Sequence, residues 1–357
     1  MSYFKRDEIL ILLGAGASVD AGIPHSKEMV RNVEELIRDE WEDHKDLYNF
    51  VKGSIHYGDG VQGKFGDEVT YDIERLVNTL EELRKKEEHP LYPFVGSWLP
   101  KLVEVSGENF NQIKELRDRI VGRLRDRWLS IRYPECADYY QAIEQFQEQY
   151  EHPLRVFTLN YDLCVERNCD SEILERGFEN RKWDWQRFEL EEENIYLYKL
   201  HGSTDWKREG GHLTYENPDH IDDDEVEIIF GTTQKMQYTD PFLFLAYELR
   251  KWTLSRVKLI VSIGYGFSDD HINNILGQSL RTRDETKLLS ISPVESEEER
   301  EGWIQDELGL DRGDQIVCWD MTAQEFMEEN MSVPLLAEEL FPEDQELFVE
   351  VPEDEES

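Results

Sequence analysis

The sequence predicts an α/β fold in which a Rossmann-like parallel sheet carries helices on both faces and a large helical insertion. Residues Ile9–Leu13 form a fully apolar run that ends at a glycine, which is typical of a buried parallel strand. Later apolar runs alternate with helical segments, and that pattern is typical of a parallel sheet covered by helices. Between these parts, residues 31–150 show mostly helical periodicity.

The first strand opens a strand–turn–helix unit. The segment Gly14-Ala15-Gly16-Ala17-Ser18 is expected to form a tight turn, and Ser26–Asp39 a helix. In the stretch that follows, two segments repeat apolar residues at helical spacing, namely Ile73, Leu76, Val77, Leu80 and Leu83, and then Phe110, Ile113, Leu116, Ile120 and Leu124. Residues 31–150 are therefore predicted to be a mostly helical module.

Strand patterns return after this module. They lie at Arg155–Leu159, Ile195–Leu200, Val226–Phe230, Lys258–Ile263 and Lys287–Ile291, with a weaker one at Gln315–Trp319. Helices are expected between several of them, at Pro241–Leu254, Asp269–Gln278 and Glu295–Glu307. Because the first strand precedes the helical module, the sequence predicts one Rossmann-type domain (1–30 plus 151–335) with an insertion (31–150). Residues 336–357 are predicted to be an acidic C-terminal tail.

Composition excludes several classes of function. The formal net charge of −40 argues against direct nucleic-acid binding and against binding to an anionic membrane surface. No apolar run approaches the roughly 18 residues of a membrane span, and the N-terminus does not resemble a signal peptide. The four cysteines, at 136, 164, 169 and 318, include no CxxC pair, so no metal site is expected. We expect a cytoplasmic protein.

Three segments end predicted strands with polar or glycine residues: Gly14–Ser18, Thr158–Asp162 and Leu200–Ser203. Ligand sites of parallel sheets lie beyond the carboxyl ends of the strands, so the three segments are expected to meet at one crevice. Taken singly, each has a plainer interpretation. The glycine segment can be a tight turn without ligand, the Asn-x-Asp a turn or helix cap, and the histidine a structural residue.

In order along the chain, the glycine segment, Thr158–Asp162 and Lys199–Ser203 resemble three motifs of the sirtuin (silent information regulator) family. Gly264–His271 and Ile291–Pro293 stand where that family has later nucleotide-binding turns. The sequence is most similar to the sirtuin-like NAD-degrading effectors of prokaryotic antiphage defence, in a branch without zinc. The resemblance covers residues 8–30 and about 154–320. It departs from deacylating sirtuins after Pro24, where His25-Ser26-Lys27 replaces Asp-Phe-Arg, and in lacking their zinc-binding CxxC pairs.

The resemblance implies an NAD+ glycohydrolase that cleaves NAD+ to nicotinamide and ADP-ribose, as a gated effector that depletes NAD+ in antiphage (abortive infection) defence. NAD+ is then the substrate, and no metal is required. Three alternatives remain: an ADP-ribosyltransferase, a protein deacylase of sirtuin type, and a non-catalytic sensor of NAD or ADP-ribose. Nicotinamide release without a modified acceptor separates the hydrolase from the others.

Site residues follow from the same resemblance. The implied catalytic residues are Asn160, which bonds a ribose hydroxyl or positions water, Asp162, which bonds the carboxamide or favours the growing cation, and His201, a general base. The implied NAD-binding residues are Gly14, Ala15, Gly16, Ala17, Ser18, Gly22, Ile23, Pro24, Thr158, Tyr161, Gly264, Tyr265, Ser268 and Ser292.

Gating implies partners. The resemblance implies a homo-oligomer and a partner protein such as a HerA-type ATPase or a short argonaute. The insertion is expected to roof the crevice and to provide a self-association surface, because it is rich in aromatic residues, including Trp41, Tyr57, Trp98 and Trp128. The alternative is that these rings fill the insertion's own core.

Overall fold

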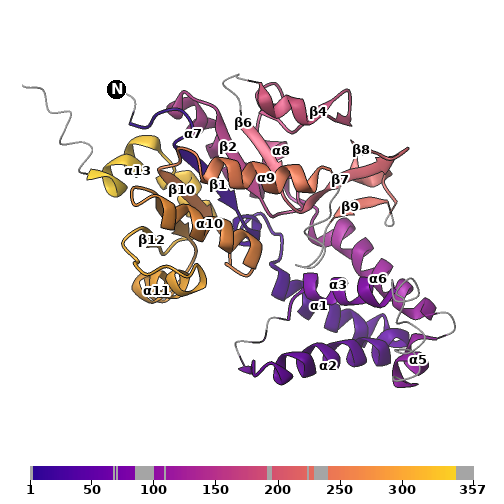
Figure 1. Cartoon of the computed structure of the whole chain (residues 1–357). Coiled ribbons are helices and arrows are strands. Elements are labelled where there is room, and N and C mark those ends of the chain that lie inside the picture. Colours follow the sequence, from indigo (N-terminus) through magenta and orange to yellow (C-terminus); the bar gives the residue numbers. More distant parts are fainter. Residues whose placement is uncertain are drawn as a thin grey trace, which may run out of the picture.

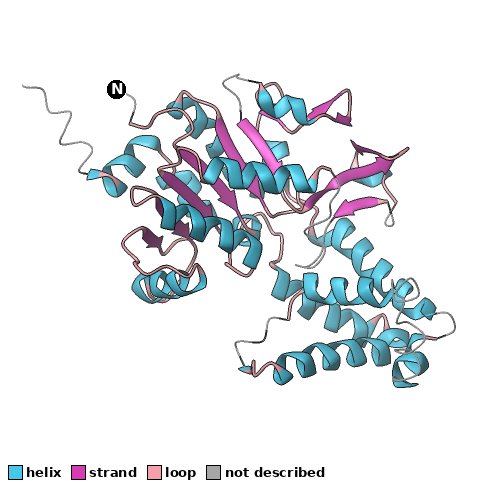
Figure 2. Cartoon of the chain, viewed as in Figure 1, coloured by secondary structure: helices cyan, strands magenta, loops and turns pink. Residues whose placement is uncertain are grey.

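The computed structural model describes residues 3–66, 69, 71–84, 100–107, 110–190, 195–222, 225–228 and 240–342. At its centre lies a parallel sheet with helices on both faces, which confirms the predicted fold class (Figures 1 and 2). From one edge to the other, its seven strands are β12 (Ile316–Trp319), β11 (Lys287–Ile291), β10 (Leu259–Ile263), β1 (Ile9–Leu13), β2 (Leu154–Thr158), β6 (Ile195–Lys199) and β3 (Leu174–Glu175). All neighbouring strands pair in parallel.

The order of the strands shows a doubly wound sheet. From the central strand β1 the chain builds β2 and β6 on one side. It then crosses back to place β10 against the other side of β1 and continues outward to β11 and β12. Winding therefore reverses between β1 and β10, and the crevice beyond the carboxyl ends of two such strands is where open α/β sheets bind ligands.

Alternate residues of β1 serve two hydrophobic cores. Ile9, Ile11 and Leu13 pack in the core that includes residues of α1 (Ser26–Asp39), α7 (Ala142–Tyr150) and α13 (Val333–Leu340). Leu10 and Leu12 pack in the opposite core, with residues of α9 (Phe242–Thr253), α10 (Asp270–Thr282) and α11 (Glu297–Glu307). Burial on both faces explains why this strand is apolar at every position.

Residues 31–150 are mostly helical where the structure describes them. Besides the remainder of α1, the helices are α2 (Lys45–Val61), α3 (Ile73–Arg84), α5 (Pro100–Ser106), α6 (Asn111–Arg123), the π-helical turn η6 (Leu124–Trp128), the 3-10 segment η7 (Pro134–Gln141) and α7. Figure 1 shows α1, α2, α3, α5 and α6 gathered in a lobe beside the sheet, whereas α7 packs against α13. Of the four aromatic residues singled out there, Trp41 and Trp128 are buried, Tyr57 is exposed, and Trp98 lies outside the described residues.

The predicted boundary of the tail, residue 336, falls inside helix α13. Leu336, Ala337 and Leu340 of that helix are buried in the core, so this part of the chain is a packed helix. Residues 343–357 lie outside the described residues.

A second sheet, which is antiparallel, was not predicted. Its strands, in order, are β4 (Phe178–Glu179), β5 (Lys182–Trp183), β8 (His212–Tyr215), β7 (Gly202–Glu209) and β9 (Val226–Ile228). The prediction that Val226–Phe230 belongs to the parallel sheet is wrong for the described part, because β9 pairs antiparallel with β7. Phe230 lies outside the described residues. A short strand pattern carries no information on its partner, and β7 was missed because most of its residues are polar.

Candidate active site

The glycine turn after β1 packs directly against the turn after β10. Gly14 N donates a hydrogen bond to Ile263 O across 2.9 Å, and Gly16 N donates to Gly264 O across 2.8 Å. A Cβ atom on Gly264, whose φ is +65°, would lie 2.1 Å from Ala17 N. Two backbones therefore meet at the point where the winding reverses, and the glycines are required for that contact whatever ligand binds there.

Ser18, Asn160 and Asp162 form a buried polar network beneath the glycine turn. Ser18 Oγ donates to Asp162 Oδ2 across 2.8 Å, and Asn160 Nδ2 donates to both Ser18 Oγ (3.1 Å) and Gly14 O (2.9 Å). The second carboxylate oxygen of Asp162 accepts from Cys164 N at 3.0 Å. Asn160 N donates to Thr158 Oγ1 at 3.0 Å, which fixes the start of this segment. The predicted meeting of the first two motifs is thus a set of direct hydrogen bonds.

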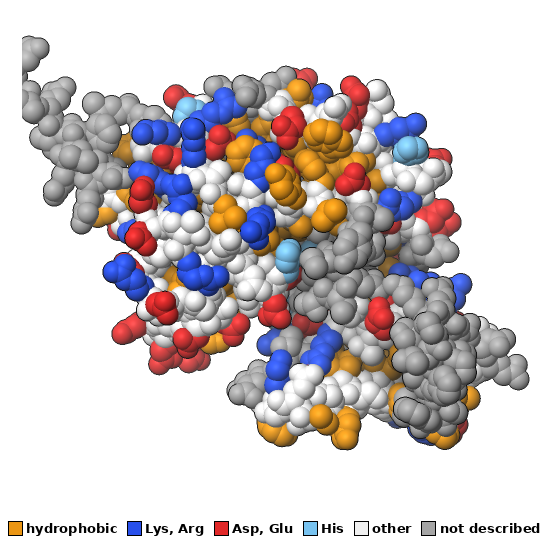
Figure 3. Space-filling model, viewed as in Figure 1, with side chains coloured by type: hydrophobic (Ala, Val, Ile, Leu, Met, Phe, Trp, Pro, Cys, Tyr) orange, Lys and Arg blue, Asp and Glu red, His pale blue; other side chains and the backbone are white. Residues whose placement is uncertain are grey.

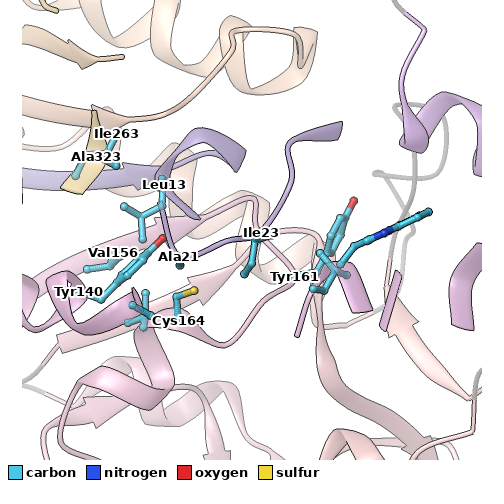
Figure 4. Close-up of a cluster of buried hydrophobic side chains, with 14 of the residues drawn as sticks. Leu13, Ala21, Ile23, Tyr140, Val156, Tyr161, Cys164, Ile263 and Ala323 are labelled. Carbon is cyan, nitrogen blue, oxygen red and sulfur yellow. The ribbon is translucent and has the colours of Figure 1, made fainter. Parts of the chain in front are cut away.

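Two tyrosines of η7 complete this network, and no sequence pattern pointed to either. Tyr139 donates its hydroxyl to Ala17 O across 2.6 Å, and the Tyr140 hydroxyl lies 2.9 Å from Ser18 Oγ. Because the only proton of Ser18 Oγ goes to Asp162, Tyr140 is the donor. In Figure 4 the Tyr140 side chain runs from beside Val156 and Cys164 toward the β1 turn. Burial raises the pKa of the Tyr140 hydroxyl well above 10.0, so it stays a donor at every physiological pH.

His201 follows β6 and is buried, with 4% of its surface exposed. Its Nε2 atom lies 3.4 Å from Asp269 Oδ2, and its Nδ1 atom is buried without a hydrogen-bond partner among the described residues. The ring of Tyr161 lies beside it, at 6.3 Å between ring centroids. The histidine therefore has one side fixed by protein and one nitrogen left for a ligand or water.

Lys199 connects the segments that carry His201 and Asp162. Its ammonium donates to the backbone oxygen of Asp162 and lies 3.0 Å from Glu166 Oε1, with only 2% of the lysine side chain exposed. Arg176 extends the chain of charges by contacting Glu166 at 3.3 Å and Asp205 at 2.7 Å. The ends of β2 and β6 are thus held together by buried, paired charges, which are costly to break singly.

The remaining predicted residues divide between two places. Ser268 is exposed on the turn after β10, and Tyr265 is buried there, while Ser292 is half-buried after β11. Gly22, Ile23 and Pro24 instead line a cleft of about 740 Å³ between the β1–α1 loop, α1 and the segment from α6 to η7. Neither Asn160 nor His201 lines this cleft.

Three further observations concern classes of function. In the part of the chain that the structure describes, no three His, Cys, Asp or Glu side chains are grouped as metal ligands. The described helices include none that is long and apolar enough to cross a membrane. On the face seen in Figure 3, acidic and basic side chains of the described residues are interspersed.

Comparison with known proteins bears on the second half of the chain. Residues 154–311 match the family of SIR2-like domains, and this range includes Asn160, Asp162 and His201 but not the glycine turn. No curated protein matches the chain. Among solved structures it is similar to Sir2Tm bound to a propionylated peptide, with 13% identity over 90% of this chain and 91% of that one, at a TM-score of 0.38. The SIR2-like match supports a sirtuin-like family for the region that carries these residues.

Proposed function

We propose that the protein is an NAD+ glycohydrolase that releases nicotinamide and ADP-ribose. The observation that carries this proposal is the meeting of Asn160, Asp162 and the glycine turn in one hydrogen-bonded network at the carboxyl ends of β1 and β2. His201 follows the neighbouring strand β6, and its free Nδ1 atom is the group that such a site needs as a base. The SIR2-like match over residues 154–311 supports the use of NAD+.

The residues suit the substrate. Ala15 is exposed at the glycine turn, and Gly266, in the facing turn, has open space where a side chain would point. The N–H groups of Gly14 and Gly16 already donate within the protein, so a pyrophosphate would bind backbone at the exposed positions Ala15 and Gly266. The motif implies that Ser18 binds NAD+, but its hydroxyl is already hydrogen-bonded to three partners within the protein.

Each side chain then has a chemical role. Breaking the nicotinamide–ribose bond develops positive charge on the ribose, and the carboxylate of Asp162 provides a fixed negative charge nearby. Asn160 uses its amide nitrogen to hold the turn, so its Oδ1 atom, which has no partner among the described residues, is left to accept from a ribose hydroxyl or water. His201 accepts a proton from water or a ribose hydroxyl through Nδ1, a contribution of about 10²–10⁴-fold for a general base.

The test is to incubate the purified chain with NAD+ and to quantify nicotinamide and ADP-ribose. We expect stoichiometric formation of both in the active protein and loss of turnover in His201→Ala. His212→Ala is the matched control because His212 is exposed on β8, and it should retain full turnover. Labelled ADP-ribose on a protein acceptor, or deacylation of an acyl-lysine peptide, would favour the transferase or deacylase instead. NAD+ binding without turnover under every condition would favour a sensor.

We further propose that this activity is gated and serves antiphage defence, because an uncontrolled NADase would deplete its own cell. A homo-oligomer and a partner such as a HerA-type ATPase or a short argonaute are proposed as the gate. The exposed Tyr57 on α2 is the one described aromatic of the four that is free to join such an interface, since Trp41 and Trp128 are buried. Nicotinamide release by the chain alone and with neighbouring gene products, together with the mass of each species in solution, tests the gate.

A further inference from the structure

Asp269 is the N-cap residue of helix α10, and its two carboxylate oxygens make different contacts. One oxygen, Oδ1, accepts hydrogen bonds from His271 N at 2.9 Å and Ile272 N at 3.3 Å, which caps the helix. The other oxygen, Oδ2, lies 3.4 Å from His201 Nε2. Capping alone needs only one oxygen, so the second contact has a separate consequence.

The carboxylate is held rigidly in this position. Asp269 is 3% exposed, and its carbonyl oxygen accepts from Asn273 N at 2.9 Å and lies 3.3 Å from the Tyr265 hydroxyl. Asn273 in turn accepts from Tyr265 through Oδ1 and donates to Phe267 O through Nδ2. Because the cap fixes Oδ1 and these bonds fix the backbone, Oδ2 stays directed at the imidazole.

We propose that Asp269 is a positioning residue that fixes the orientation and the tautomer of His201. A carboxylate is only an acceptor, so it selects the tautomer in which Nε2 carries the proton. The lone pair is then on Nδ1, the atom that is buried without a partner among the described residues. The inference rests on the proposed function for its catalytic meaning, but the pairing itself concerns only the two side chains.

Asp269→Asn separates this role from capping. Asparagine caps helices about as well as aspartate, so the stability of α10 should change little. Its amide nitrogen can donate to Nε2, however, and would then favour the opposite tautomer, with the proton on Nδ1. In a serine protease the same type of change lowers kcat by roughly 10⁴-fold. Here we expect kcat for NAD+ to fall by at least about 10²-fold with KM changed by less than about three-fold.

The tautomer is measured by nitrogen NMR on protein labelled at histidine, near pH 8.5, with His201→Ala identifying the signal. We expect the Nε2–H form in the unchanged chain and the Nδ1–H form in Asp269→Asn. Asp270→Asn is the matched control because Asp270 is exposed on the same turn, and it should leave tautomer and kcat unchanged.

An Nδ1–H tautomer in the unchanged chain, or one that Asp269→Asn leaves unaltered, would overturn the proposal. The tautomer of the unchanged chain decides the matter even if Asp269→Asn fails to fold. If the expected tautomers are observed but NAD+ is not turned over, the positioning role of Asp269 is supported and the proposed glycohydrolase activity is contradicted.

Discussion

The hydroxyl of Tyr161 donates a hydrogen bond to Glu74 Oε1 across 3.1 Å, and this bond joins the β2 turn to helix α3 of the lobe. The Tyr161 ring also lies beside His201, so one side chain contacts both the lobe and the imidazole. Burial and the Glu74 carboxylate raise the pKa of this hydroxyl well above 10.0, which keeps it a donor. A displacement of α3 would therefore move the Tyr161 ring, which lies beside the proposed base His201.

Tyr161→Phe removes this link and should lower the free energy of unfolding by about 1–2 kcal/mol, since a buried bond to a charged acceptor is lost. Amide exchange in α3 should become faster while exchange in β1 stays slow. Urea unfolding and hydrogen exchange check both. The control is Tyr57→Phe on α2, where the ring is 75% exposed and no change beyond about 0.5 kcal/mol is expected. Equal stability and exchange in Tyr161→Phe and the control would show that the link does not couple lobe and site.

The contact between the two turns makes a prediction for two glycines only two residues apart. Gly264→Ala places a Cβ atom 2.1 Å from Ala17 N at a positive φ, so it should cost at least about 3 kcal/mol or prevent folding. Gly266→Ala meets no atom within 4 Å and should stay within about 1 kcal/mol of the unchanged chain. Thermal unfolding of both proteins is the measurement. Similar melting temperatures for the two would mean that the turns are not in contact.

The hydroxyl network predicts that substitutions of Ser18 and Tyr140 have non-additive effects on the free energy of unfolding. Ser18→Ala leaves the Tyr140 hydroxyl and Asp162 Oδ2 short of a partner, and each buried unpaired group costs about 1–3 kcal/mol. Adding Tyr140→Phe removes one of the orphaned groups. The double variant should therefore be destabilised less than the two single variants added together, by about 0.5 kcal/mol or more in urea unfolding. Strict additivity would contradict the bond between these hydroxyls.

The four cysteine thiols should react with a thiol reagent at very different rates. Cys136 is exposed at the edge of the 740 Å³ cleft, whereas the other three cysteines are buried. Burial raises the pKa of Cys169 and of Cys318 to about 12, and it raises that of Cys164 as well, so these thiols are scarcely ionised near pH 8. A thiol reagent should label one group rapidly in the folded chain and four in urea. Cys136→Ser should abolish the rapid phase, and two or more rapid groups in the unchanged chain would contradict this burial.

The parts of the fold that the sequence predicted are those where burial leaves a simple pattern. Strands β1, β10 and β11 are mainly apolar because both faces are covered, and their predicted bounds differ from the observed ones by at most one residue. Strand β7 escaped prediction because it carries polar residues such as Asp205, whose carboxylate pairs with the distant Arg176. A strand that is stabilised in this way has no local hydrophobic signal.

At the site, too, the sequence predicted the features that leave a local pattern and missed those that depend on tertiary contacts. The glycine, Asn-x-Asp and histidine segments were predicted to meet because each ends a strand of one sheet. Asp269 stands at the start of a predicted helix, and its contact with His201 depends on tertiary structure, which no local sequence pattern reveals. Tyr139 and Tyr140 offered no signal at all, because a tyrosine pair in a helical stretch is typical of ordinary core packing.

The position of β1 in the sheet also determines when the molecule can be completed during synthesis. The strand leaves the ribosome first, yet its partners are β2, which begins at Leu154, and β10, which begins at Leu259. At roughly 5–20 residues per second, the apolar edge of β1 waits on the order of 10–50 s for its second neighbour. Nascent chains must be shielded from aggregation for that time, and the crevice between β1 and β10 cannot assemble until most of the chain has been translated.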